Sequence, residues 1–252
     1  HYVLYDGVSA VRSWAEVENV GEAPQTLDYI TSFAYYGVSD GVEGSFEDKM
    51  LFDIPYNTWH GELQWHRKSA WELGLMDMEC PSLRRLTISQ TGSWSSGEYA
   101  PLAVLEREGS SDCLCWQIEH NGSWGWESGN ILGNGLYLQL TGPNGDQHAF
   151  EKVLEPGERF CSVPVAVGVS DEGFDGAIGV LTRYRRRIRR PNRDNRELPI
   201  IFNDYMNCLM GDPTEEKILL LVDAAAAAGC EYYVMDAGWF SESEGGDDDW
   251  WP

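Results

Sequence analysis

Polar and aromatic side chains follow two short apolar runs near the C-terminal end of the sequence. The run "LPIIFND" delivers Asn203 and, just beyond it, Tyr205. The run "CEYYVMDAGWF" delivers Asp236 and Trp239. Carboxylates and amides hydrogen-bond to hydroxyl groups, and aromatic rings pack on the apolar C–H faces of sugars. The four side chains therefore fit a polyhydroxylated ligand, although an Asp after a strand also serves as a loop anchor and a Trp as core packing.

The segment between the two runs predicts a helix that would bring them together. In "DPTEEKILLLVDAAAAAG", Asp212 suits the N-cap, Pro213 the first helical position and Glu215 a capping-box arrangement. Gly229 suits the position that follows the C-cap. A strand, a helix and a strand form a βαβ unit with parallel strands, and ligands bind at the carboxyl ends of such strands. We therefore expect the four side chains at one edge of a sheet.

The ends of the chain indicate that both domains are incomplete. Two parallel strands leave open edges and an uncovered face, so we expect the second domain to be truncated at Pro252. The chain begins at His1 without a signal-peptide pattern, so we also expect a missing N-terminal segment. The location stays undefined, with a weak preference for the cytoplasm. The acids between Glu242 and Asp249 indicate a solvated loop.

Residues 1–174 have the pattern of an antiparallel β-sandwich. Short alternating segments such as "LRRLTISQTGSW", "PLAVLERE" and "GLYLQLTGPNGD" are separated by Gly-, Asn- and Ser-rich stretches, among them "HNGSWGWESGN". Residues 175–198 indicate a linking helix and a polar linker, and we expect the arginines of this helix to pair with acidic neighbours. Residues 199–252 form the second, α/β domain.

Composition narrows the classes of partner. The 252 residues carry a formal net charge of −23, which disfavours nucleic acid and anionic membranes, and no apolar run is long enough for a membrane helix. The eleven Trp and twelve Tyr fit either packing within β-structure or stacking on sugars. The six cysteines lack metal-ligand spacing, so we expect free thiols and no metal site.

The chain resembles the melibiase-type α-galactosidases, glycoside hydrolase family thirty-six. The resemblance covers the whole chain and is sharpest over residues 199–240, in "PIIFNDYM", "TEEKILLLVDAAAAAG" and "VMDAGWF". It implies an N-terminal antiparallel β-supersandwich followed by the first strand, helix and strand of a (β/α)8 barrel. It also implies a divergent member, because Ala237 stands where the family has a second Asp and Tyr205 where it has a Trp.

The resemblance also implies roles for the strand-end residues. Asp236 would bind sugar hydroxyls and Trp239 would form a wall of the same pocket, while Asn203 and Tyr205 belong to the first-strand motif. The implied reaction is retaining hydrolysis of terminal α-linked galactose, or a related sugar, from oligosaccharides or glycoconjugates. It needs two carboxylates and no cofactor. Both carboxylates are expected beyond residue 252, so no catalytic residue is assigned in this chain.

Two alternatives stay open, and one further property is implied by analogy. An α-N-acetylgalactosaminidase of the same family would fit the two departures. A non-catalytic carbohydrate-binding protein would use the same strand ends to bind a sugar without hydrolysing it. Relatives of this kind imply assembly into a homo-oligomer.

Overall fold

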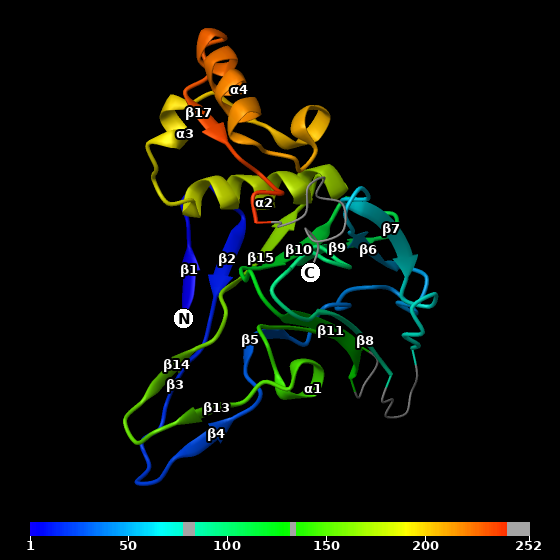
Figure 1. Cartoon of the computed structure of the whole chain (residues 1–252). Coiled ribbons are helices and arrows are strands. Elements are labelled where there is room, and N and C mark those ends of the chain that lie inside the picture. The colour runs from blue at the N-terminus through cyan, green and yellow to red at the C-terminus, as the bar shows by residue number, and fades with distance from the viewer. Residues whose placement is uncertain (78–83, 132–134, 241–252) are drawn as a thin grey trace. The chain divides into compact units, whose positions relative to one another are not determined.

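The computed structural model describes residues 1–77, 84–131 and 135–240 (Figure 1). The acidic segment from Glu242 to Asp249, predicted to be a solvated loop, lies outside these residues. Contacts along the chain divide it into two units, His1–Arg189 and Arg190–Pro252. Within the described residues no helix is long and apolar enough to cross a membrane.

The first unit is built from short strands and one long helix. Its strands are β1 (Tyr2–Leu4), β2 (Ala10–Ser13), β3 (Glu16–Glu18), β4 (Gln25–Leu27), β5 (Thr31–Tyr35), β6 (Met50–Tyr56), β7 (Gln64–Ser69), β8 (Arg85–Gln90), β9 (Leu102–Arg107), β10 (Cys113–Ile118), β11 (Trp124–Ile131), β12 (Gly135–Thr141), β13 (Lys152–Leu154), β14 (Arg159–Cys161) and β15 (Val165–Ser170). Its helices are α1 (Gly145–His148) and α2 (Gly173–Ile188).

Two antiparallel sheets pack face to face in this unit. The larger has the strand order β1-β2-β15-β10-β9-β6-β7, and the smaller has the order β5-β12-β11-β8. Their facing side chains share one core, in which the Phe52 ring stacks on Trp126 at a centroid distance of 6.3 Å. Trp116 meets Trp126 edge to face at 5.1 Å. The antiparallel sandwich predicted from the alternating segments is therefore confirmed.

Strand β11 shows that the interpretation of "HNGSWGWESGN" as a turn-rich separator was wrong. The strand pairs with both β8 and β12, and its Trp124 and Trp126 are buried. A Cβ on Gly129 would lie 2.8 Å from the Tyr137 ring, so the absence of a side chain makes room for that ring. Glycines in this segment mark close packing inside a sheet, which composition alone does not distinguish from a turn.

Helix α2 packs on the outer face of the larger sheet. Leu181 and Tyr184 are buried against a cluster that includes Cys113 and Cys115 of β10. The division after Arg189 places the helix with the sheets. Within the described residues of the first unit, the arginines of this helix form no ion pair with an acidic neighbour, and Arg185 Nε donates to Gln117 Oε1 at 2.7 Å. The exposed arginines without such a partner are Arg183, Arg186, Arg187, Arg189 and Arg190.

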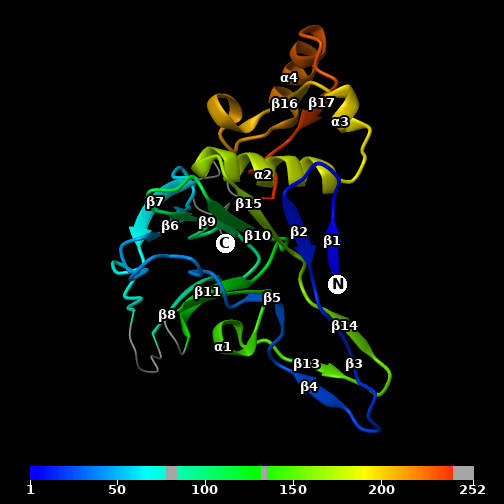
Figure 2. The same ribbon diagram turned by 180° about the vertical axis from the view of Figure 1, so that it is seen from behind.

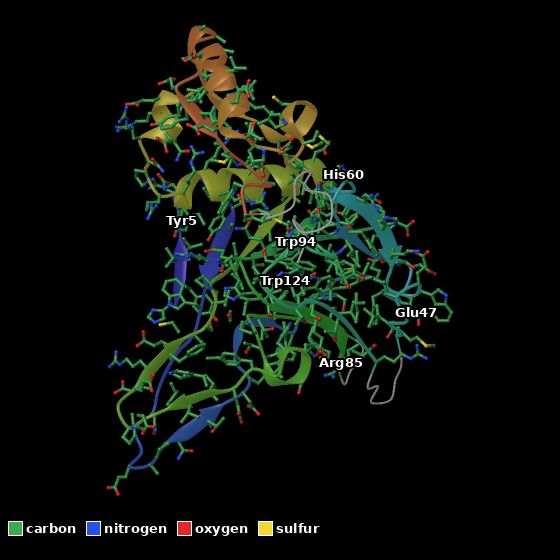
Figure 3. All side chains as sticks on the ribbon, viewed as in Figure 1. Tyr5, Glu47, His60, Arg85, Trp94 and Trp124 are labelled. Carbon is green, nitrogen blue, oxygen red and sulfur yellow. The ribbon has the colours of Figure 1, made fainter. Side chains whose placement is uncertain are left out.

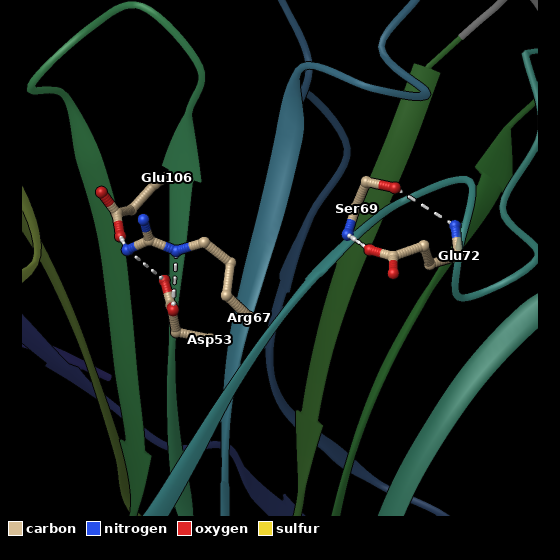
Figure 4. Close-up of polar contacts among 5 residues, drawn as sticks. All are labelled: Asp53, Arg67, Ser69, Glu72 and Glu106. Atoms are coloured by element: carbon tan, nitrogen blue, oxygen red, sulfur yellow. Dashed lines mark hydrogen bonds and ion pairs between the residues drawn. The ribbon is translucent and has the colours of Figure 1, made fainter.

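A charged cluster joins three strands of the larger sheet (Figure 4). Arg67 of β7 donates from Nε to Asp53 Oδ1 of β6 at 3.0 Å, and its Nη2 contacts Glu106 of β9. Desolvation, together with the neighbouring Asp53, raises the pKa of Glu106, while the Arg67 charge opposes the rise. Next to the cluster, Ser69 N donates to Glu72 Oε2 at 2.8 Å and Glu72 N donates to Ser69 Oγ at 3.2 Å. These contacts fix the register of β6, β7 and β9 and close the turn after β7.

Two short ribbons extend from the sandwich (Figure 2). They are the antiparallel pairs β3 with β14 and β4 with β13. Asn19 joins them, because its Nδ2 donates to Leu154 O at 2.8 Å and to Ala23 O at 2.9 Å. An isolated two-stranded ribbon is marginal in water, so this buried amide stabilises a part of the unit that has little core of its own.

The second unit contains a parallel pair of strands with a helix between them. Its elements are α3 (Asp194–Glu197), β16 (Ile201–Asn203), the π-helical turn η1 (Tyr205–Leu209), α4 (Glu215–Ala227) and β17 (Tyr232–Val234). Strands β16 and β17 pair in parallel. The segment expected to be a polar linker contains α3, which is a single short turn of helix.

The N-terminus of α4 differs from its prediction. Thr214, not Asp212, is the N-cap: its extended backbone presents Oγ1 to Lys217 N at 3.4 Å. Asp212 forms an ion pair with the Lys217 ammonium group, and Pro213 precedes the cap instead of opening the helix. Both residues can cap by type, and a proline at the first helical position would suit Asp212, so the sequence does not decide between them. At the other end Gly229, with φ +87°, follows the C-cap as predicted.

Candidate functional site

The two strand ends of the second unit meet at one edge. Asn203 lies opposite Val234 in the parallel pair, so Asn203 and Asp236 leave their strands close together. Asn203 Nδ2 donates to Asp236 Oδ2 at 2.7 Å, and Asn203 Oδ1 accepts from Tyr205 N at 2.9 Å. The amide thus has one donor and one acceptor in use, and the carboxylate and the start of η1 are held in a fixed relation to each other.

Asp204 is a buried residue that hydrogen-bonds to both Asp236 and Tyr233 at this edge. It is 1% exposed, and its Oδ1 accepts from Asp236 N at 3.1 Å while its Oδ2 accepts from the Tyr233 hydroxyl at 3.1 Å. Desolvation and the hydrogen bond to Asp204 raise the pKa of Tyr233 to about 12, so its hydroxyl remains a donor at neutral pH. Asp204 therefore positions Asp236. The sequence shows it as an acid directly after a strand, but nothing there distinguishes a buried anchor from a ligand-binding group.

Trp239 lies beside the carboxylate with its ring exposed. Its Nε1 donates to the main-chain oxygen of Asp236 at 3.1 Å, and its ring meets Phe240 edge to face at 5.2 Å. The side chain is 62% exposed in the part of the chain that the structure describes. The N–H bond holds the indole beside the carboxylate, where its ring can stack on a ligand.

The turn that carries Trp239 requires glycine. Gly238 has φ +91°, and a Cβ there would lie 1.8 Å from Gly211 O. Gly211 in turn lies beside the Tyr205 ring, whose Cε2 would be 3.6 Å from a Cβ on Gly211. This close approach of two backbones holds Trp239 and Tyr205 on neighbouring turns.

The structure thus brings together the four residues that the sequence singled out. Asn203, Asp236 and Trp239 form one hydrogen-bonded set, and Tyr205 joins it through its main-chain N–H. The set offers carboxylate oxygens, an amide and an exposed ring, which suit hydroxyl groups and an apolar C–H face. Within the described residues no group of three or more His, Cys, Asp and Glu stands where it could hold a metal ion.

Comparison with known proteins shows what the segment with both strand ends resembles. The melibiase family model matches residues 160–250, which include both strand ends. Over 96 residues the chain is 38% identical to α-galactosidase AgaA from Geobacillus stearothermophilus, covering 38% of this chain and 13% of that protein. It is 22% identical over 248 residues to α-galactosidase 1 from Pediococcus pentosaceus, covering 96% of this chain and 31% of that protein. The segment that carries both strand ends is therefore similar to the melibiase-type α-galactosidases.

Solved structures share the fold of this chain. The crystal structure of AgaA, a GH36 α-galactosidase, superposes with a TM-score of 0.76 at 21% identity, covering 96% of this chain and 31% of that chain. The α-galactosidase from Lactobacillus brevis superposes with a TM-score of 0.72 at 17% identity, covering 95% and 30%. The chain therefore spans about a third of the length of these structures, and the antiparallel sheets match their N-terminal region.

Proposed function

We propose that this chain is part of a retaining glycosidase that releases α-linked galactose, or a related sugar, from oligosaccharides or glycoconjugates. The observation that carries the proposal is the hydrogen-bonded edge formed by Asn203, Asp236 and Trp239 in a segment that the melibiase family model matches. The relatives are α-galactosidases, and AgaA variants have been crystallised with raffinose and with stachyose. The substrate class of this chain is proposed from those ligands.

In this proposal β16, α4 and β17 are the first strand, helix and strand of a (β/α)8 barrel. Supporting this, the apolar side chains of the pair are open to solvent in the described residues: Ile201 is 57% exposed and Tyr232 is 52% exposed. Leu220 on α4 is 67% exposed. Parallel strands are normally covered on both faces, so these side chains fit elements of a larger α/β domain. The division into residues 1–174, 175–198 and 199–252 and a homo-oligomeric assembly belong to the same proposal.

Asp236 binds the sugar in this mechanism and performs no bond cleavage. Retaining hydrolysis needs a nucleophilic carboxylate and an acid/base carboxylate about 5–5.5 Å apart. We assign Asp236 neither role, because it follows the second strand of the proposed barrel, where the resemblance implies a sugar-binding carboxylate; Asn203, Asp204 and Trp239 hold it in place. Its carboxylate accepts from sugar hydroxyls while the Trp239 ring packs on the sugar face.

Ala237 favours a second candidate, an α-N-acetylgalactosaminidase of the same family. A methyl group at this half-buried position offers no hydrogen bond and occupies less space than a carboxylate. Loss of one charge-assisted hydrogen bond costs about 1.5–3 kcal/mol of binding, and the vacated space suits a larger substituent on the ring. A non-catalytic carbohydrate-binding protein would use the same edge without the two carboxylates.

The test compares two substrates on the full-length protein. An aryl α-galactoside and an aryl α-N-acetylgalactosaminide are assayed side by side for the wild type and for Ala237→Asp. We expect Ala237→Asp to raise kcat/KM for the galactoside relative to the N-acetyl sugar. An unchanged preference would show that Ala237 does not set specificity, and the absence of hydrolysis of both substrates would leave the non-catalytic alternative.

A further inference from the structure

The side of helix α2 that faces away from the larger sheet is charged, and the described residues of the first unit leave it uncovered. On the sheet side Tyr184 is buried, and its ring meets Tyr5, labelled in Figure 3, edge to face at 5.8 Å. At about 3.6 residues per turn, the opposite side of the helix carries Asp175, Gly179 and Arg186. Asp175 and Arg186 are exposed, and Gly179 is partly exposed. This face is therefore open to a partner from outside the unit.

The charges on this face are separated by sign along the helix. Exposed acids stand at its N-terminal end, and they are Asp171, Glu172 and Asp175. Exposed arginines stand at its C-terminal end, and they are Arg183, Arg186 and Arg189. The helix dipole favours this order within one helix. The same order gives the helix an acidic half and a basic half, each of which attracts the other half of an identical helix placed antiparallel to it.

The polar groups on the two sides of α2 differ in their partners. Toward the sheet, Arg185 Nε donates to Gln117 Oε1 at 2.7 Å, and the Tyr184 hydroxyl donates to a carboxylate of the sheet. On the outward side, within the described residues of the first unit, the Asp175 carboxylate and the Arg186 guanidinium group form no hydrogen bond or ion pair. The sheet therefore satisfies the inward groups and leaves the outward charges to another surface.

The spacing of this face is symmetric about the middle of the helix. Asp175 and Arg186 lie equally far along the chain from the midpoint of the helix, and so do Gly179 and Thr182. When two copies of α2 lie antiparallel about a twofold axis at that midpoint, Asp175 of each copy comes opposite Arg186 of the other. One contact of this kind therefore forms two identical ion pairs.

Small side chains stand at the middle of the same face. Gly179 has no side chain, and Thr182 Oγ1 donates to Ile178 O of its own helix at 2.8 Å. Neither residue presents a bulky or charged group, so two helices can approach closely there. The face thus carries its charges toward the ends and permits contact in the middle, as an antiparallel helix pair requires.

We propose that α2 forms a twofold contact with α2 of a second copy of this chain, with Asp175 of each copy paired to Arg186 of the other. The partner is the chain itself because one face supplies both charges at matching positions. Copies of a chain with net charge −23 repel one another, so paired opposite charges are what can set their orientation. The inference rests on the homo-oligomeric assembly included in the proposed function, and it names the surface that forms it.

The test is analytical ultracentrifugation of the full-length protein at low ionic strength, where exposed charges are least screened. Arg186→Glu places acids opposite acids across the contact, and Asp175→Lys places bases opposite bases. Each variant alone should therefore have a dissociation constant at least about tenfold above that of the wild type. An equimolar mixture of the two variants should associate as the wild type does, because every acid then faces a base. Arg187→Glu is the matched control: it makes the same change in charge at an exposed residue about 100° around the helix from Arg186.

The outcomes decide the proposal. Arg187→Glu should sediment as the wild type does, and all variants should melt at the wild-type temperature. A monomeric wild type would overturn the proposal, as would unchanged association of both single variants, a mixture that does not associate, or an equal loss in Arg187→Glu. Hydrolysis rates judge the proposed glycosidase separately. An active monomer would overturn only the α2 contact, and an inactive protein whose variants associate as expected would overturn only the glycosidase.

Discussion

Asn203 is the residue on which the geometry of the strand-end site depends. Its amide nitrogen donates to the Asp236 carboxylate at 2.7 Å, and its amide oxygen accepts from the start of η1 at 2.9 Å. An acid of the same shape keeps the second contact and replaces the first with repulsion between two carboxylates. Comparing the native Asn203 with an Asp at the same position therefore tests whether the amide positions Asp236.

Asn203→Asp should raise KM for an aryl α-galactoside about tenfold or more at pH 7 in the full-length protein, because Asp236 is then repelled from its place. The effect should shrink as the pH is lowered and the carboxylate pair takes up a proton. Asn203→Ala, which removes the donor without adding charge, is the control and should show no such pH dependence. Equal KM values for the wild type and Asn203→Asp at pH 7 would contradict the role given to the amide.

Tyr233 gives the site a dependence on alkaline pH. Desolvation and the hydrogen bond to Asp204 raise its pKa to about 12, compared with about 10 in an unfolded chain. A raised pKa means that the fold favours the protonated hydroxyl, so its contribution to stability is complete below pH 10 and is lost as the pH rises toward 12.

The difference in unfolding free energy between the wild type and Tyr233→Phe should therefore be constant up to about pH 10 and then narrow. Denaturant titrations of both proteins from pH 8 to pH 11.5 measure it. Using the difference cancels the other tyrosines whose pKa is raised, such as Tyr99 and Tyr137. A difference that stays constant across this range would mean that the Asp204 contact does not hold the Tyr233 proton.

At the scale of elements, the turn after β17 is the most constrained feature of the site. Gly238 combines φ +91° with a backbone atom, Gly211 O, only 1.8 Å from where a Cβ would stand. Gly229 has nearly the same conformation, φ +87°, but has no atom within 4 Å of the corresponding point. Comparing substitutions at Gly238 and Gly229 therefore separates the cost of a left-handed backbone from the cost of steric overlap.

Gly238→Ala should lower the unfolding free energy by roughly 2 kcal/mol more than Gly229→Ala, because only the first substitution forces two backbones apart. It should also reduce hydrolysis, since Trp239 and Asp236 belong to the same turn. Thermal melting of the two variants measures the difference. Similar melting temperatures would show that the turn can relax, and that its shape is not set by the contact with Gly211.

Capping residues and apolar runs in the sequence predicted which helices and strands surround the site better than they predicted the exact residues at which those elements begin and end. The position of α4, its terminal Gly229 and the two strand ends follow from caps and apolar runs. Thr214 and not Asp212 is the N-cap, which the sequence did not predict because both are good caps by type and Pro213 suits the position after Asp212. Strand β11 was missed because the composition of Gly125, Ser128 and Gly129 is that of a turn, and the room that Gly129 leaves for the Tyr137 ring is visible only in the structure.

For the whole molecule, the alternation of apolar and polar residues predicts the antiparallel sandwich. The charged residues do not reveal which groups they contact in the fold. Alternating segments predict antiparallel sheets, and these sheets match the N-terminal region of GH36 α-galactosidases. The arginines of α2 were expected to meet acidic neighbours, yet the described residues supply none. Charge pattern identifies a basic face but does not locate its counterpart, because that depends on long-range packing. Asp204 was likewise visible as an acid, while its burial depends on the pairing of β16 with β17.

Whether Asp236 binds the sugar of a glycosidase is decided by one comparison of catalytic efficiency. It is kcat/KM for an aryl α-galactoside, compared between the full-length wild type and Asp236→Ala at equal thermal stability. Loss of a charge-assisted hydrogen bond worth about 1.5–3 kcal/mol predicts a decrease of roughly 10- to 150-fold, with the variant still folded. A folded Asp236→Ala protein that hydrolyses the galactoside at the wild-type rate would contradict the account.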